Sequence, residues 1–87
     1  MNDENEVLND DVVALYKKLT IALQSIKLGV AGRIVYFSKE LKMFILAVHS
    51  TSPDDTERAG NIALDAIRDT VYLEILEAGF GFACKQI

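Results

Sequence analysis

The strongest local signal in this sequence is the segment Ser-Pro-Asp-Asp at residues 52–55, which marks the start of a helix. Ser52 is a preferred N-cap residue, and Pro53 suits the first helical position because its missing N–H has no intrahelical partner there. The two carboxylates that follow meet the positive end of the helix dipole. Apolar residues then recur as far as Gly79, a residue type that commonly ends helices. We therefore predict a helix over residues 53–78.

A second helical pattern precedes this one. Asn9 or Asp10 provides an N-cap, and Gly29 provides a stop. Between them, apolar residues recur at alternating spacings of four and three, which places them on one helical face: Val12, Tyr16, Leu19, Leu23 and Ile26. We predict a helix over residues 11–28. Residues 1–9 are acidic and contain few apolar groups, so we expect a disordered leader there.

Residues 30–49 are ambiguous between a helix and a β-hairpin. The same four-three spacing continues through Val30, Ile34, Phe37, Leu41, Phe44 and Val48, which fits a helix. However, residues 33–37 and 42–48 are rich in aromatic and branched side chains, as two strands around a turn would be. We favour the helix because the intervening Ser-Lys-Glu-Leu lacks the Gly or Asn that tight hairpin turns prefer.

Three helices joined by short connections predict an all-α fold, a small antiparallel three-helix domain. The alternative is an α+β fold with a hairpin at about residues 33–48. In either case residues 10–87 form a single domain, with an apolar C-terminal tail from residue 79. Because the chain has only 87 residues and 51% of them are hydrophobic, one small core cannot hide all of the apolar surface. We therefore expect two chains to share one core in a homodimer.

The expected interface lies on the predicted third helix and on the tail. That helix carries two apolar faces, and a thin domain covers only one of them well. The tail adds two phenylalanines held between glycines. The predicted interface residues are Ile62, Ala66, Leu73, Leu76, Phe80 and Phe82.

Catalytic, cofactor and metal sites are not indicated by the sequence. His49 is the only imidazole, and it lacks the converging ligands that a metal site requires. Cys84 is the only cysteine, and no pattern brings it to His49 as a nucleophile and base would require. We expect no enzymatic activity and no bound cofactor.

The charge balance also limits the classes of partner. A net charge of −4 disfavours non-specific binding to nucleic acid, and we expect no membrane segment because the longest strongly apolar block, residues 43–48, is far too short to span a bilayer. With a single cysteine and no signal peptide, we expect a cytoplasmic protein.

The sequence therefore predicts a protein–protein interaction module, an adaptor, inhibitor or regulator that acts as a homo-oligomer. The alternatives are a module that binds a small apolar ligand between helices and, less favoured, a DNA-linked regulator.

Overall fold

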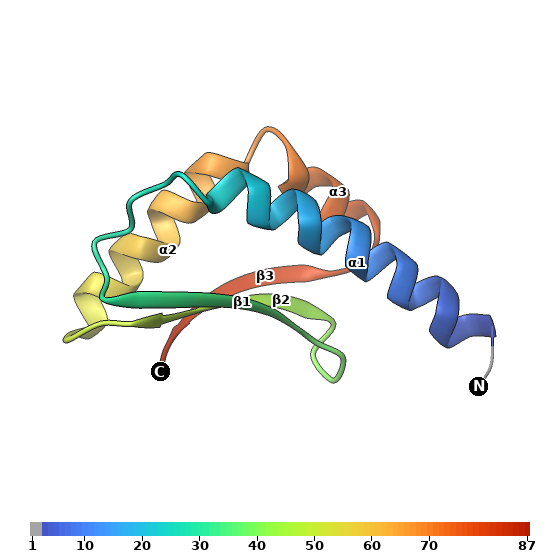
Figure 1. Ribbon diagram of the computed structural model, residues 1–87, viewed down its shortest axis with the longest axis horizontal. Helices are drawn as coiled ribbons and strands as arrows, with labels where there is room; N and C mark the ends of the chain where they lie inside the picture. Colours follow the sequence, from blue (N-terminus) through green and yellow to red (C-terminus); the bar gives the residue numbers. More distant parts are fainter. Residues whose placement is uncertain (1–2) are drawn as a thin grey trace.

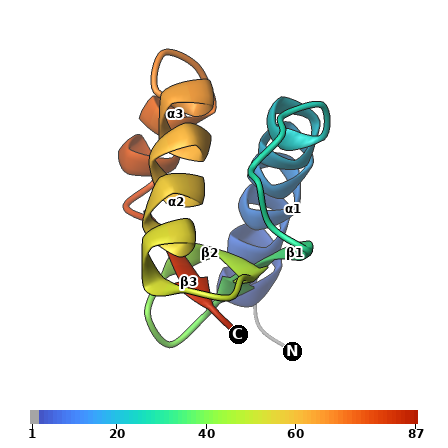
Figure 2. The ribbon, with the colours of Figure 1, turned by 90° about the vertical axis from the view of Figure 1, so that its left-hand side faces the viewer.

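The computed structural model describes the backbone of residues 3–87 and the side chains of residues 10–87. Three strands form one sheet in the order β1-β2-β3, with β1 antiparallel and β3 parallel to β2. All three helices lie on one face of this sheet (Figures 1 and 2). The elements in chain order are α1 (Asp3–Leu23), β1 (Gly32–Ser38), β2 (Met43–His49), α2 (Pro53–Ile67), α3 (Val71–Glu77) and β3 (Gly81–Gln86). The domain is α+β, so the prediction of an all-α three-helix domain, a helical bundle, is wrong.

The hairpin that the sequence left as an alternative is present as β1 and β2. Its register is unbroken from Gly32 opposite His49 to Ser38 opposite Met43. The turn closes without Gly or Asn because Lys42 itself adopts a positive φ of 53° and the Leu41 N–H donates to Ser38 Oγ over 3.2 Å. The helix prediction failed because segments this rich in apolar residues contain a four-three spacing whichever structure they form, whereas the branched and aromatic composition favours strands.

The predicted start of the helix at Pro53 is confirmed, but the helix is divided into α2 and α3. Ser52 Oγ accepts a hydrogen bond from the Asp55 N–H at 3.2 Å, as an N-cap does. After Ile67 the chain turns, and the N–H and hydroxyl of Thr70 both donate to the Ile67 carbonyl, at 3.0 and 3.2 Å. Val71 and Ile75 of α3 face the same core as Ile67 of α2.

The predicted helix stop at Gly79 is also confirmed. Gly79 has φ +86°, its N–H donates to the Leu76 carbonyl, and the Phe80 N–H donates to the Ile75 carbonyl, which together form a Schellman motif. The residues that follow, expected as a flexible apolar tail, form β3 beside β2, with Phe82 opposite Phe44. The helical pair α2 and α3 therefore serves as the crossover between two parallel strands.

The first helix begins at Asp3 and ends at Leu23, earlier than the predicted end at residue 28. The predicted leader at residues 1–9 overlaps its start, and residues 1–2 and the side chains of residues 3–9 lie outside what the structure describes. At the other end, the Arg33 guanidinium donates to the carbonyls of Leu23 at 2.8 Å and Gln24 at 3.3 Å. Arg33 on β1 therefore satisfies carbonyl groups that the end of α1 leaves without intrahelical partners.

One core lies between the sheet and the helix layer. Its largest fully buried side chains are Leu19, Phe44, Leu46, Val48, Ile67 and Ile75. At the hairpin end, the rings of Phe37, Phe44 and Phe80 pack edge to face or tilted, with centroids 4.9 to 6.1 Å apart. The side chains of the even-numbered residues of β2 thus face this core, and those of the odd-numbered residues face the opposite side of the sheet.

Candidate interaction surfaces

The predicted interface residues divide into three groups. Phe80 is 7% exposed and belongs to the core, so it does not lie on a free surface. Ile62, Ala66 and Phe82 are half-buried and pack against the core. Leu73 and Leu76, at 53% and 46% exposure, are the only members of the set that project well into solvent, from the outer side of α3.

The two candidate reactive side chains lie at separate places. His49 is exposed at the end of β2 instead of ending a helix as the sequence suggested, and Cys84 is half-buried in the middle of β3. The Cys84 thiol donates to the Thr56 carbonyl at 3.7 Å, and burial raises the pKa of that thiol. A raised pKa leaves little thiolate at neutral pH, and the thiolate is the nucleophilic form. Within residues 10–87, no group of three or more His, Cys, Asp and Glu side chains converges in a way that could hold a metal ion.

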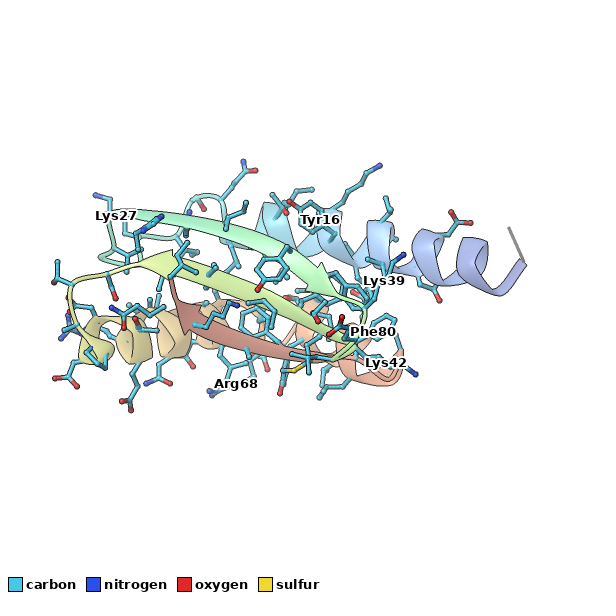
Figure 3. The ribbon with its side chains drawn as sticks, turned by 90° about the horizontal axis from the view of Figure 1, so that it is seen from below. Tyr16, Lys27, Lys39, Lys42, Arg68 and Phe80 are labelled. Atoms are coloured by element: carbon cyan, nitrogen blue, oxygen red, sulfur yellow. The ribbon has the colours of Figure 1, made fainter. Side chains whose placement is uncertain are left out.

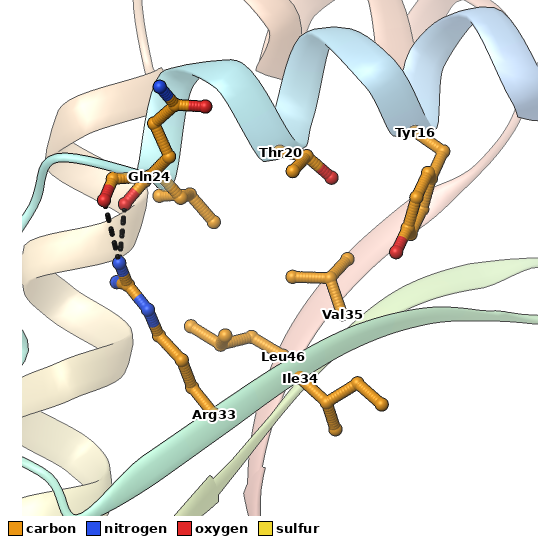
Figure 4. Close-up of a pocket in the computed structure, with 8 residues that line it drawn as sticks. Tyr16, Thr20, Gln24, Arg33, Ile34, Val35 and Leu46 are labelled. Carbon is orange, nitrogen blue, oxygen red and sulfur yellow. Dashed lines mark hydrogen bonds between the residues drawn. The ribbon is translucent and has the colours of Figure 1, made fainter.

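A groove separates α1 from β1. Its volume is about 350 Å³, and Figure 4 shows Val35 pointing toward α1 while Ile34 points away from it. The residues that line the groove are Tyr16, Thr20, Leu23, Gln24, Arg33, Ile34, Val35 and Leu46. The only charged one, Arg33, is bonded to the end of α1, as described above. The groove is therefore largely apolar and presents no free carboxylate.

The side of α1 above this groove is mostly uncharged. Residues spaced by three and four along a helix share one side, and the uncharged ones here are Val13, Tyr16, Thr20 and Gln24, which we call the α1 strip; Lys17 lies at its margin. All four are exposed, with Val13 at 49% and Tyr16 at 38%. Four exposed uncharged residues along one side of a helix, with one lysine at their margin, are unusual for a surface that meets only water.

The outer edge of β1 has unpaired backbone groups. The Gly81 N–H donates to the Lys42 carbonyl and the Ile87 N–H donates to the Val48 carbonyl, so even-numbered residues of β2 bond to β3. Backbone groups of successive strand residues alternate in direction, so odd-numbered residues of β2 bond to β1. With the observed register, the even-numbered residues of β1 then face β2. The N–H and C=O groups of Arg33, Val35 and Phe37 consequently point outward, away from the sheet.

The sheet face opposite the helices is not covered by any described element, as the view from that side shows (Figure 3). We call it the open face, and its central residues are Ile34, Tyr36, Met43, Ile45, Ala47 and Ala83. Ile45 and Ala47 are 5% and 1% exposed because their neighbours cover them, whereas Ile34 is 57% exposed. Across the face, Lys85 Nζ lies 5.6 Å from the centre of the Tyr36 ring.

Sequence reasoning missed the open face and the β1 edge, although one signal for the open face was available. Residues 43–48 form an uninterrupted apolar run, which is typical of a strand buried on both sides, whereas a helix on a single core needs only one apolar side. The structure buries one side of this strand under the helices and leaves the other to a thin cover of neighbouring side chains.

Comparison of the chain with protein-family models, with curated proteins and with solved structures finds no match. In the part of the chain that the structure describes, no helix combines the length and the apolar character needed to cross a membrane. The function must therefore be argued from the surfaces themselves.

Proposed function

We propose that this domain is a non-enzymatic protein–protein interaction module that works as a homo-oligomer, and that its self-association uses the β1 edge together with the α1 strip. The observation that carries the proposal is the unprotected edge. Proteins usually guard a free edge with charged residues, proline or a bulge, because unpaired N–H and C=O groups pair readily with another chain. β1 has no proline, its register has no bulge, and its one charged residue, Arg33, bonds to α1.

A second copy fits this edge without a conflict of charge. A two-fold axis at Val35 places each outward-facing residue opposite another outward-facing one, with Val35 beside the partner's Val35 and Arg33 beside the partner's Phe37. On the open face the same register places Ile34 beside the partner's Tyr36, an aromatic and β-branched pair of the kind that stabilises antiparallel sheets. The pairing would join two three-stranded sheets into one and bring the two uncharged α1 strips toward each other.

Sedimentation velocity of wild-type and variant protein tests this proposal. We expect the wild type to sediment as a dimer at micromolar concentration and Val35→Pro to sediment as a monomer. Proline removes the outward N–H of residue 35 but takes no hydrogen bond from the β1–β2 pair, so the domain itself should fold. Circular dichroism checks the folding.

Two matched variants isolate the backbone effect. Val35→Ala shortens the same side chain but keeps the N–H, and we expect it to remain dimeric. Gln86→Pro removes an outward N–H on β3, together with the hydrogen bond that the Gln86 side chain donates to the Ser50 carbonyl, and it should also leave the dimer intact. A wild type that is monomeric at micromolar concentration would refute self-association. If Leu73→Glu separated the dimer and Val35→Pro did not, the interface would lie on α3 instead.

The second candidate function is a binding module for a small apolar ligand, and the groove below α1 favours it. Its volume of about 350 Å³ lies near the lower end of the range that ligand pockets occupy. Native mass spectrometry separates the two proposals, because a monomer that retains a small-molecule adduct would support the ligand, and a dimer without an adduct would support the interaction module.

A further inference from the structure

Four lysines lie on the open face or at its ends. Lys85 on β3 reaches across the face to the Tyr36 ring. Lys39 and Lys42 lie at the hairpin end, and Lys27 lies at the opposite end (Figure 3). Within residues 10–87, none of these four lysines forms an ion pair, whereas Lys18 pairs with a carboxylate on a neighbouring helix. The only acidic residue in the hairpin and β3 is Glu40, in the turn. An apolar surface with lysines on it and at its ends favours a partner that combines apolar side chains with acidic ones.

The size of the open face indicates what kind of partner it fits. Three strands spaced by about 4.8 Å are roughly 14 Å wide, and seven residues of strand span roughly 23 Å. An α-helix with its side chains is about 10–12 Å in diameter, and about 15 residues of helix cover the same length. One helix therefore fills this face.

The face of a second copy is a poor occupant. Stacking two open faces would bring their lysines together, and like charges at an interface disfavour association. A lipid surface is disfavoured because Ile45 and Ala47 are buried, so Ile34 is the only large side chain of this face that projects far enough to insert.

We propose that the open face binds an acidic amphipathic helix of another protein. The apolar side of that helix would lie on Ile34, Tyr36 and Ala83. Lys85 would leave the Tyr36 ring to meet a flanking carboxylate on the β3 side, and the hairpin lysines would meet carboxylates at one end. This proposal rests on the proposed function in requiring a protein partner, but it does not require the dimer, because the face is complete in one chain.

Binding of designed peptides to the full chain tests the proposal. The probe is a fluorescently labelled peptide of about 15 residues with leucine on one helical side and glutamate on the flanks. The two controls are a twin with lysine in place of glutamate and a scrambled glutamate peptide without an apolar side. We expect the acidic amphipathic peptide to bind at least about tenfold more tightly than either control, since tenfold corresponds to only about 1.4 kcal/mol.

Protein variants then locate the site. Ile34→Asp and Lys85→Glu should each weaken binding of the acidic peptide by about tenfold, which one lost apolar contact or one reversed charge can supply. Ile21→Asp is the matched control because Ile21 is 67% exposed on α1, away from the sheet, and it should bind as the wild type does. Amide shifts in NMR spectra should change at Tyr36, Ala83 and Lys85.

The same titration on Val35→Pro separates this proposal from the dimer. Binding that persists in a monomeric variant supports the helix site whatever the oligomeric state, and loss of peptide binding in a wild type that still dimerises overturns this proposal alone. Equal binding of the acidic and basic peptides would overturn the helix site, as would changes in NMR amide shifts that are confined to α3. Association with mixed phosphatidylserine and phosphatidylcholine vesicles, in the absence of peptide binding, would assign the face to a lipid surface and overturn it too.

Discussion

The two edges of the sheet differ in how closely the helix above each of them packs. On the β3 side, α2 approaches so closely that a Cβ added at Gly60 would lie 3.0 Å from the Cβ of Cys84. On the β1 side, α1 leaves a groove of about 350 Å³. The same chain thus packs one margin of its helix layer to contact distance and leaves the other margin open.

The charges of the two helices follow the same division. The outer surface of α2 carries Asp54, Glu57, Arg58 and Asp65, a set suited to water. The four residues of the α1 strip are uncharged, and Lys17 is the one charged residue beside them. Two copies meeting at the β3 edge would have to desolvate or oppose the four charged side chains of α2, whereas two copies meeting at the β1 edge would meet only Lys17 and Arg33, which already bonds to α1. The difference indicates that this chain completes the β3 side by itself and that another chain completes the β1 side.

The largest effect that we expect is a loss of folding stability when the close packing between α2 and β3 is disturbed. Gly60→Val places branched atoms where Cys84 already lies, and overpacking of this kind costs about 1–3 kcal/mol. The loss should appear in urea denaturation although valine is a better helix former than glycine.

The matched change on the β1 side is Thr20→Leu, which adds volume over the groove. Because the added atoms meet open space, we expect the free energy of unfolding to change by no more than about 0.5 kcal/mol. If Gly60→Val unfolded at the same urea concentration as the wild type, the contact between α2 and β3 would be able to relax, and the two edges would not differ in packing.

The features that the sequence predicted correctly are those that depend on neighbouring residues. The cap at Ser52 and the stop at Gly79 each involve only a few consecutive residues, and both are present. The burial of Leu19 and Leu23 followed from helical periodicity, although Tyr16, predicted on the same face, is 38% exposed beside the groove. Local geometry is therefore well specified by local sequence.

The features that the sequence did not predict depend on distant residues. β3 is a strand because it pairs with β2 across the whole α2–α3 crossover, and Gly-Phe-Ala-Cys-Lys-Gln carries little strand signal of its own. Phe80 was assigned to an interface because it follows a helix in an apolar tail, but it packs on Phe37 and Phe44, which only the hairpin places there. The open face and the β1 edge exist only once the sheet has formed, so helical periodicity could not reveal them.

A smaller effect should follow from loosening α2 at its N-terminus, where it covers the β3 side. Ser52→Ala removes the hydroxyl that accepts from the Asp55 N–H, and loss of an N-cap costs about 1 kcal/mol. Thr51→Ala is the control, because the Thr51 hydroxyl makes only a long, exposed contact of 3.4 Å with the Asp55 carboxylate. Urea denaturation of both variants measures the difference. Equal stability of Ser52→Ala and wild type would mean that solvent replaces the cap, and that α2 is not anchored more firmly than α1.

The smallest effect concerns the Cys84 thiol, which reports how well α2 seals the β3 side. Burial raises the pKa of this thiol in the folded chain, so between the unfolded and folded pKa values the unfolded chain has lost a proton that the folded chain retains. The thiol's contribution to stability is therefore fully present below the pKa of an unfolded cysteine, about 8.5, and is lost as the pH rises through the folded pKa. We expect the stability difference between wild type and Cys84→Ala to shift against the wild type over that alkaline range, by a small amount because the thiol is only half-buried. Subtracting the Cys84→Ala curve removes the titration of tyrosine and lysine, which the two proteins share.

Alkylation of Cys84 with iodoacetamide at pH 8 should also be slower in the folded protein than in urea. Equal rates would show that the β3 side is as open to solvent as the β1 side.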